Sequence, residues 1–279
     1  MRKGLRVTFW GVRGSVCTPV PENMFFGGNT PCIEVRRGDA PPIILDGGSG
    51  IRLLGDKMMK ESGGLPGPVH VFLTHFHYDH IQGIPFFPLL YHAGTPVHFY
   101  SMDPSLRDLL TGQMAKPYFP VQLPDTENYF HQIPPEGLIV EGTRVIPFAL
   151  RHSDPVSGFR LEAPEGIVVY ASDHEHGEAH FDEGLVRAAQ GADLLIYDAH
   201  FTPEEYPQRT GWGHSTWLEA AKIARASGAR RLALFHHAPE RSDSEMKSVV
   251  LQAKRHFAGV FAARERQTVE IGRPARPGV

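Results

Sequence analysis

Four potential metal ligands lie within six consecutive residues, in the segment His75-Phe-His77-Tyr-Asp79-His80. The segment directly follows Val69–Leu73, a short apolar stretch typical of a buried strand. Side chains two apart on an extended chain share a face, and a tight turn can bring Asp79 and His80 round toward a second ion. Imidazole together with carboxylate favours zinc, manganese or iron over magnesium. The segment therefore predicts a metal site at a strand end, with a solvated histidine-rich loop as the alternative.

The order of the expected elements constrains the fold. In each half of the chain strands come first and helices follow, which indicates mixed sheets with helices on their outer faces, in one domain over residues 1–279. A Pro- and aromatic-rich segment near residues 85–135 is interpreted as an insertion that shapes the mouth of a pocket. Strands are predicted over Leu5–Trp10, Cys32–Arg36, Ile43–Leu45, Val69–Leu73, Thr143–Leu150, Gly158–Leu161, Gly166–Ala171, Leu194–Tyr197 and Arg231–Phe235. Helices are predicted over Ile51–Glu61, Ser105–Ala115, Asp182–Gln190, Thr216–Ser227 and Ser242–His256.

Composition excludes several classes of protein. The net charge of −3 over 279 residues argues against a broad basic surface for nucleic acid. The first residues lack the apolar region of a signal peptide, and no apolar run is long enough to span a membrane. Two cysteines, Cys17 and Cys32, fit a reducing compartment, so we expect a cytoplasmic protein. The 16 histidines stand out, because histidine is the commonest metal ligand.

The chain resembles the metallo-β-lactamase superfamily of hydrolases. His-x-His-x-Asp-His after a strand is the signature of that superfamily, and four more segments match its motifs in the same order. They are Asp46-Gly-Gly-Ser-Gly50, Arg151-His152, Val168-Val-Tyr-Ala-Ser-Asp173 and Leu232-Ala-Leu-Phe-His236. The resemblance extends over nearly the whole chain. It implies an α/β fold, a four-layer αββα sandwich of two mixed β-sheets, in which the aspartate of the first motif braces the metal loop.

The resemblance also implies a ligand set for two divalent metal ions. Zinc is favoured, and manganese and iron are alternatives. Carried over by position, the first metal would be held by His75, His77 and His152, the second by Asp79, His80 and His236, and Asp173 would bridge them.

Three of these assignments have alternatives. His152 stands beside polar residues and could be a surface histidine. Asp198 also closes an apolar strand and competes with Asp173 for the bridging position. His236 and His237 are adjacent, and only one of them should face the metal. We favour His152, Asp173 and His236.

The last third of the chain narrows the chemistry. A strand ending in Asp198 is followed by Trp212-Gly-His214-Ser-Thr216, which resembles the ribonuclease Z and phosphoribosyl cyclic phosphodiesterase branch. In that branch an acid orients the histidine, which supports catalysis. A phosphodiester leaves as an alkoxide, and a histidine held in one tautomer can give it a proton. Alternatively, His214 only precedes a helix whose N-cap is Ser215 or Thr216.

The function expected is that of a metal-dependent hydrolase, a phosphodiesterase acting on a small cyclic or nucleotide diester through a dimetal-bound hydroxide. His214, Asp198 and Asp79 are the expected catalytic residues. We expect a small-molecule substrate and no association with a membrane. RNA is less favoured as a substrate, because the 85–135 segment is not strongly basic. A homodimer is compatible with the superfamily. A thioester or lactone hydrolase of the glyoxalase II or lactonase kind is the alternative, and it ranks second because it would not need the Gly-His-Ser-Thr element. A di-iron redox protein ranks lower, because it usually has glutamate in place of His77.

Two other groups of residues have open interpretations. Arg13, Arg151 or Arg209 could clamp a phosphate bidentately, although ordinary surface charge is the simpler explanation for each. The segment Asp173-His-Glu-His176 adds polar groups after the expected bridging acid. It is interpreted as a solvated loop, with pocket lining as the alternative.

Overall fold

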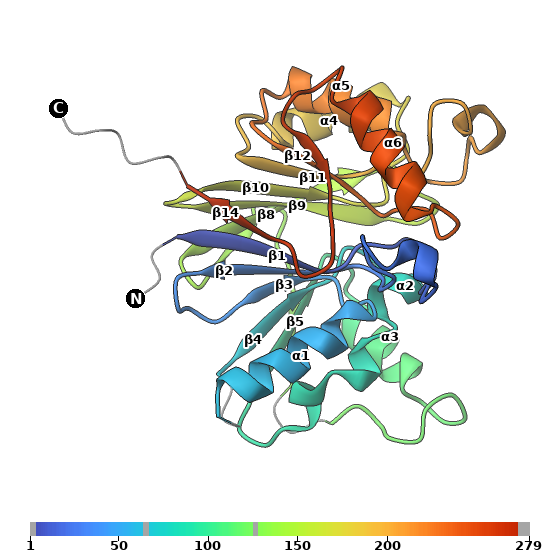
Figure 1. The fold of residues 1–279 in the computed structure, drawn as a ribbon. Helices are drawn as coiled ribbons and strands as arrows, with labels where there is room; N and C mark the ends of the chain where they lie inside the picture. Colours follow the sequence, from blue (N-terminus) through green and yellow to red (C-terminus); the bar gives the residue numbers. More distant parts are fainter. Residues whose placement is uncertain (1–3, 64–66, 125–127, 273–279) are drawn as a thin grey trace.

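Two seven-stranded β-sheets pack face to face in the computed structural model, and helices cover their outer faces (Figure 1). The structure describes residues 4–63, 67–124 and 128–272. The predicted αββα sandwich is therefore confirmed. Within the described residues, no helix is both long and apolar enough to cross a membrane.

The first sheet has the strand order β14-β1-β2-β3-β4-β5-β6. Pairing is antiparallel from β14 to β3 and parallel from β3 to β6, so the ends of β4 and β5 lie at one edge. The strands are β1 (Leu5–Gly11), β2 (Cys32–Arg37), β3 (Ile43–Leu45), β4 (Val69–Phe72), β5 (Val97–Ser101), β6 (Asn128–Gln132) and β14 (Thr268–Ile271).

The second sheet has the strand order β13-β12-β11-β10-β9-β8-β7. The strands from β10 to β13 are parallel, whereas β7, β8, β9 and β10 pair antiparallel. The carboxyl ends of β10, β11 and β12 therefore share one edge, the position at which open α/β sheets bind ligands. The strands are β7 (Leu138–Val140), β8 (Thr143–Leu150), β9 (Val156–Ala163), β10 (Gly166–Ala171), β11 (Leu194–Asp198), β12 (Leu232–Phe235) and β13 (Val260–Ala262).

Helices α1 and α3 lie below the first sheet, and α4, α5 and α6 lie above the second in the view of Figure 1. Local sequence sets where they begin: Thr216 caps α5 by accepting the Glu219 backbone N–H at 3.2 Å, and Ser242 with Glu245 forms a capping box on α6. The helices are α1 (Gly50–Glu61), α2 (Tyr78–Ile81), α3 (Leu106–Gln113), α4 (Ala179–Ala188), α5 (Trp217–Ala226) and α6 (Asp243–Ala253), and the short 3-10 turns are η1 (Pro21–Asn23), η2 (Ile84–Phe86), η3 (Pro88–Tyr91) and η4 (Tyr206–Gln208).

The alternation of side chains along the strands separates the core into layers. In β10, Val168 and Tyr170 belong to the cluster between the two sheets, whereas Val169 and Ala171 belong to the cluster under the helices of the second sheet. Both faces of this strand are buried, which explains why its sequence is continuously apolar. Aromatic rings fill the layer between the sheets, and the Phe9 and Phe235 ring centroids lie 6.1 Å apart.

Each strand and helix expected from the sequence is present, with ends that shift by a few residues. Three strands between residues 85 and 145 were not predicted: β5, β6 and β7. β5 and β6 pair with β4 within the first sheet, so part of the segment near 85–135 is sheet. Histidine and tyrosine rings stack along one face of β5 and β6, where His98 and His131 are half-buried and Tyr129 is exposed. Polar side chains on this face weaken the apolar pattern that marks a strand.

Candidate metal centre

The loop after β4 is held by one buried aspartate. Asp46 accepts the Thr74 backbone N–H at 2.9 Å through Oδ1, and its Oδ2 lies 2.8 Å from His80 Nδ1. The Tyr170 hydroxyl donates to the same Oδ2 at 2.7 Å. Asp46 has a φ of 61°, in the left-handed region, and its side chain is completely buried. The carboxylate therefore fixes the ring of His80 and the start of the loop, as the resemblance implies.

Side chains from three other strand ends meet this loop. His152 follows β8, and its Nε2 lies 3.2 Å from His77 Nδ1. Asp173 follows β10, and its Oδ2 lies 3.1 Å from His80 Nε2. His236 follows β12, and its Nε2 lies 3.1 Å from Asp79 Oδ2. All seven residues expected to hold metal thus come together at one edge of the sandwich, near α2 in Figure 1.

The cluster has the donor types and the spacing that divalent metal ions require. One ligand atom from each of His75, His77 and His152 lies within 4.8 Å of the others, and the same holds for Asp79, His80 and His236. A further group of this kind joins His75, His80 and Asp173. Among the described residues, the buried Nε2 of His75 has no hydrogen-bond partner. The buried Nε2 of His80 has the Asp173 carboxylate 3.1 Å away but makes no hydrogen bond of normal geometry. A buried ring nitrogen without a partner destabilises the fold, and a bound metal ion would give it one. These residues are therefore suited to hold divalent metal ions.

Asp173 and Asp198 occupy different positions in the cluster. Asp173 lies between the two histidine groups, since its Oδ1 is 3.4 Å from His236 Nε2 and 3.8 Å from His152 Nε2. Asp198 Oδ1 accepts the backbone N–H of Ser215 at 3.0 Å, and its Oδ2 accepts a hydrogen bond from the ring of His214. Of the two carboxylates, Asp173 is the one placed between both groups.

His236 and His237 point in opposite directions. His236 has a φ of 57°, which turns its ring toward Asp79. The ring of His237 instead donates from Nε2 to the Ala263 carbonyl oxygen at 2.9 Å. Burial, with Arg13 close by, lowers the pKa of His237 to about 3, so this ring is neutral. Left-handed residues such as His236 and Asp173 (φ 59°) cost about 1–3 kcal/mol each and concentrate at functional sites.

His214 lies beside the cluster and is paired with a carboxylate. Its Nδ1 lies 2.8 Å from Asp198 Oδ2. Burial alone would lower the pKa of His214, but the Asp198 carboxylate outweighs burial and the pKa rises to about 9. Thr216, two residues later, caps α5. His214 therefore both precedes a helix and contacts a carboxylate, so the two interpretations of this residue are compatible.

His214 is held in place by residues to which the sequence interpretation gave no such role. Glu175 accepts the backbone N–H of Gly211 at 2.6 Å and of Gly213 at 2.9 Å, and it also accepts the Tyr206 hydroxyl at 2.9 Å. Glu175 is 3% exposed and its neighbour His174 is fully buried. The interpretation of this segment as a solvated loop is therefore wrong, because its side chains are enclosed by the loop that precedes His214.

Three further contacts were not foreseen. The ring of His200 stacks on that of His214 with centroids 4.4 Å apart, and its Nδ1 donates to the His236 carbonyl oxygen at 3.1 Å. The Ser15 backbone N–H donates to Asp79 Oδ2 at 2.8 Å. These groups are far apart in the sequence and meet only in the folded chain. The one signal in the sequence that could have pointed to His200 is its position two residues after Asp198.

Of the arginines considered for phosphate binding, Arg13 is excluded. It is fully buried, and its guanidinium donates to the carbonyl oxygens of Gly27 and Ala238 at 2.8 and 3.0 Å. It ties the segment after β1 to the segment after β12. Arg151 Nε lies 3.2 Å from Glu178, and the Arg209 guanidinium stacks on Trp212 at 4.7 Å.

A cavity of about 410 Å³ forms the mouth of the centre. Its lining includes four of the seven candidate ligands together with His214 and exposed Tyr78. The lining residues are Ser15, Phe76, His77, Tyr78, Asp79, His152, Asp173 and His214. A groove of about 930 Å³ adjoins it and shares Phe76 and His152. Substrate therefore has access to the cluster from solvent and from this groove.

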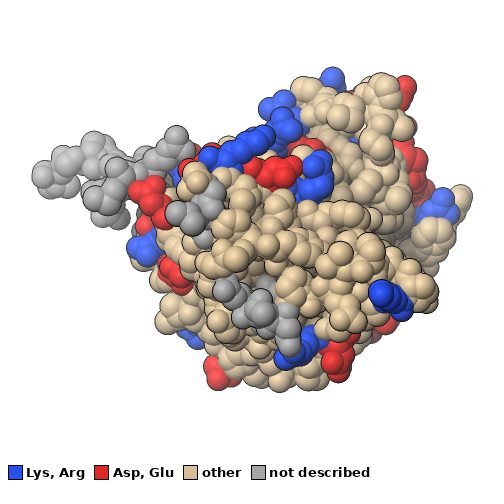
Figure 2. Space-filling view, turned by 90° about the horizontal axis from the view of Figure 1, so that it is seen from below, with Lys and Arg blue, Asp and Glu red and all other residues tan. Residues whose placement is uncertain are grey.

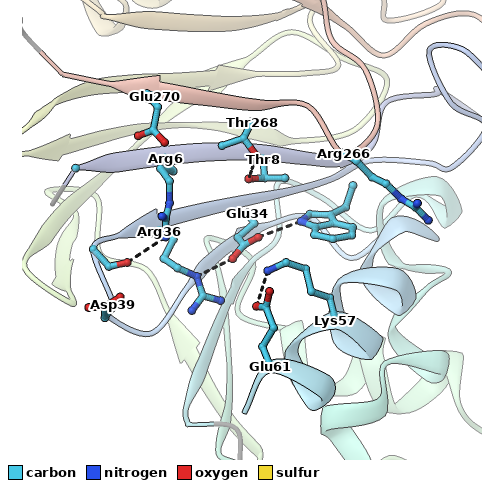
Figure 3. Close-up of a pocket in the computed structure, with 13 residues that line it drawn as sticks. Arg6, Thr8, Glu34, Arg36, Asp39, Lys57, Glu61, Arg266, Thr268 and Glu270 are labelled. Carbon is cyan, nitrogen blue, oxygen red and sulfur yellow. Dashed lines mark hydrogen bonds and ion pairs between the residues drawn. The ribbon is translucent and has the colours of Figure 1, made fainter. Parts of the chain in front are cut away.

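Another groove, of about 940 Å³, lies on the outer face of β14, β1 and β2 beside α1 (Figure 3). It shares no lining residue with the metal centre. Two of the cations that line it lie close to carboxylates: Arg36 Nε is 2.7 Å from Glu34, and Lys57 Nζ is 2.7 Å from Glu61. This groove is a polar, charge-balanced surface without a chemical centre.

Figure 2 shows how charge is distributed on one face of the molecule. Among the residues described there, Lys and Arg lie scattered and intermixed with Asp and Glu, around a broad area without charge. This face offers no continuous basic area for a nucleic-acid backbone.

Comparisons with known proteins agree with this geometry. A model described as a β-lactamase superfamily domain matches residues 43–237. An uncharacterized protein of Mycobacterium leprae is 29% identical, over 98% of this chain and 90% of its own. Ribonuclease Z of Myxococcus xanthus is 28% identical, over 72% of this chain and 80% of its own.

Solved structures share the fold. The metallo-β-lactamase fold protein YhfI from Bacillus subtilis superimposes with a TM-score of 0.74 at 21% identity, over 96% of this chain and 100% of its own. A diphosphatase from the PhnP family gives a TM-score of 0.69 at 18% identity, over 95% and 96%. At these identities the likeness establishes the arrangement of the two sheets.

Proposed function

The chain belongs to the metallo-β-lactamase superfamily, and on that premise we propose that it is a two-metal phosphodiesterase for a small cyclic or nucleotide diester. The predicted resemblance to the superfamily and its ribonuclease Z-like branch is confirmed. The observation that carries the finer proposal is the contact between His214 and Asp198 beside the cluster, at 2.8 Å. The names of two relatives, a ribonuclease Z and a PhnP-family diphosphatase, support chemistry at phosphorus.

The proposed ligands divide into two groups with one shared carboxylate. His75, His77 and His152 would hold one ion, and Asp79, His80 and His236 the other, with Asp173 between them. When bound, the ions, zinc by preference, would neutralise charge on the phosphate and lower the pKa of a water molecule held at the site. Asp79 is fixed by the Ser15 N–H, so its carboxylate can also orient that water.

His214 is the proposed proton donor to the leaving oxygen. Its Nδ1–H donates to Asp198, which fixes the ring and leaves Nε2 as the nitrogen available to substrate. With a pKa of about 9 the ring is protonated at neutral pH, and nearby cations would lower that pKa toward the working pH. As the phosphorus–oxygen bond breaks, the Nε2 proton passes to the departing alkoxide. Such help contributes about 10²–10⁴-fold.

A thioester or lactone hydrolase is the competing function. A thiolate leaves without a proton, so a thioester hydrolase would not need the His214–Asp198 pair. A phosphodiester expels an alkoxide, which leaves more readily when it receives a proton. The pair therefore favours the diester over the thioester. A lactone also expels an alkoxide, and for this alternative the names of the relatives, which point to chemistry at phosphorus, favour the diester.

The test compares leaving groups. Metal-loaded protein of measured metal content is assayed with bis-p-nitrophenyl phosphate, a cyclic nucleotide, a thioester and a lactone. His214→Ala should reduce turnover of the cyclic nucleotide by about 10²–10⁴-fold. It should reduce that of bis-p-nitrophenyl phosphate far less, because nitrophenolate departs readily unprotonated. The exposed His180 on α4 supplies the control variant, His180→Ala. Turnover confined to the thioester or lactone would overturn the proposal.

A further inference from the structure

The groove beside the metal centre has no role in the chemistry described so far. Its volume of about 930 Å³ lies at the upper end of the range for small-molecule sites. His75 and His152, two candidate metal ligands, form part of its wall, and Phe76 with His152 also lines the mouth of the centre. A molecule reacting at the cluster can therefore extend directly into the groove.

The walls of the groove are largely apolar. Phe148 comes from the end of β8, Phe181 from the first turns of α4, and Met102 and Pro104 from the segment after β5. These side chains are half-buried or exposed, so part of each is open to an occupant. Aromatic rings and prolines of this kind provide flat surfaces on which another ring can stack.

The groove follows an edge of the second sheet that carries no further strand. β7 pairs only with Thr143–Val145, so within the described residues no strand covers residues 147–150 of β8 on that side. Pro147 stands in this stretch and has no N–H to donate. Proline on an exposed edge opposes the addition of a further strand. The groove is therefore better suited to a compact group than to an extended peptide.

Charge around the groove disfavours an anionic occupant. Three carboxylates line it, those of Asp103, Asp154 and Glu178. Arg151 is the one Lys or Arg among the lining residues described, and its Nε lies 3.2 Å from Glu178. A second phosphate or a polynucleotide backbone would meet net negative charge here. An uncharged group would meet none of this repulsion.

We propose that this groove binds an uncharged aromatic substituent of the substrate while the phosphodiester group lies at the metal centre. This assignment rests on the proposed function, and it names the class of diester: one with an aryl ring or nucleobase on the side of the phosphate that does not leave. It also explains how a site with little basic surface gains affinity, since stacking and apolar burial replace phosphate contacts. Burying one ring is expected to strengthen binding about tenfold or more.

Binding of slowly hydrolysed diesters tests the proposal without relying on turnover. Isothermal titration of the metal-loaded protein compares diphenyl phosphate, dimethyl phosphate and bis(4-carboxyphenyl) phosphate. Diphenyl phosphate should bind about tenfold more tightly than dimethyl phosphate. The carboxylated ligand should bind more weakly than diphenyl phosphate, because its charges face the acidic rim. Equal affinity of the phenyl and methyl esters, or tighter binding of the carboxylated ligand, would overturn the proposal.

A pair of matched variants locates the ring. Ala149 is exposed and lines the groove, so Ala149→Trp fills it at little risk to folding. Ala93 is equally exposed but lies in the turn before β5, outside the groove, so Ala93→Trp is the control. Ala149→Trp should abolish the preference for the phenyl ester, and Ala93→Trp should keep it. A preference that survives Ala149→Trp in protein with an unchanged unfolding midpoint would place the ring elsewhere.

The two proposals fail in different ways. If the enzyme hydrolyses thioesters or lactones and no diester, the proposed function fails, and the activity assay reports it. If it hydrolyses diesters without preferring aromatic ones, only the groove assignment fails, and the titrations report it.

Discussion

The ring of His152 donates from Nδ1 to the carbonyl oxygen of Gly213 at 2.7 Å. Gly213 directly precedes His214, so one peptide connects a candidate metal ligand to the candidate proton donor. The hydrogen bond selects the tautomer of His152 that leaves Nε2 free to face the cluster. A change at Gly213 is thus expected to affect both metal binding by His152 and proton transfer by His214.

Substitution of Gly213 tests this link. A Cβ at Gly213 would lie 2.2 Å from His152 Nδ1, and the residue also has a φ of 81°. Gly213→Ala should displace both histidines, reducing metal affinity and lowering turnover about 10²-fold. Metal content by mass spectrometry and kcat on a diester measure the two effects.

Gly211 provides the matched control, since its φ is 87° but a Cβ there would meet nothing within 4 Å. Gly211→Ala carries the backbone strain alone and should cost about 1–2 kcal/mol of stability with metal content unchanged. Equal loss of metal in both variants would show that strain, and not the contact with His152, is responsible.

The adjacent histidines after β12 give a second prediction. His236→Ala should remove a ligand, and metal affinity should fall by more than the roughly 10–100-fold that a supporting residue costs. His237→Ala should retain metal, because that ring bonds to the Ala263 carbonyl oxygen and not to the cluster. It should instead lower the free energy of unfolding by about 1–3 kcal/mol through the lost buried hydrogen bond. Metal titrations and urea unfolding distinguish the two, and a reversed pattern would exchange the assigned roles.

Much of this cluster could be predicted from the sequence because its candidate ligands stand at strand ends. His75, His152, Asp173 and His236 each follow an apolar run, and parallel strands bring their carboxyl ends to one edge. Asp46 was also recognisable from its glycine turn. The same logic could not find Glu175 or His200, whose roles depend on a loop folding back over the cluster. It also missed β5 and β6, where histidine and tyrosine occupy one face and weaken the apolar pattern that marks a strand.

Glu175 gives the third prediction. Its carboxylate accepts three donors from the loop that presents His214, including the backbone N–H groups of Gly211 and Gly213. Glu175→Ala leaves these donors without their acceptor, which should cost about 1–3 kcal/mol of stability. It should lower kcat more than it changes metal content, since His214 loses its support directly, whereas the candidate ligands are affected only through the His152–Gly213 hydrogen bond. Limited proteolysis near residues 206–213 and kcat are the measurements. Glu183→Ala, at an exposed position on α4, is the control, and matching losses in both variants would contradict the role.

A ladder of stacked rings across the first sheet gives the fourth prediction. His70 and His98 stack with centroids 5.0 Å apart, and His98 Nδ1 lies 3.0 Å from His131 Nε2. Burial lowers the pKa of all three, and for His98 the neighbouring histidines lower it further. The unfolded chain, with histidine pKa values near 6.5, therefore binds protons that the folded chain does not.

The contribution of the ladder to stability should consequently be constant above about pH 7.5 and fall as the pH drops through about 6.5 and below. His98→Gln removes one of the suppressed titrations and should reduce this acid-induced loss, while His180→Gln, on the exposed surface of α4, should leave it unchanged. Urea midpoints at pH 7.5 and 5.5 measure the difference, using metal-free protein so that release of metal at low pH does not contribute. If His98→Gln and the parent lose the same stability between these two pH values, then burial of this ladder is not what makes the fold sensitive to acid.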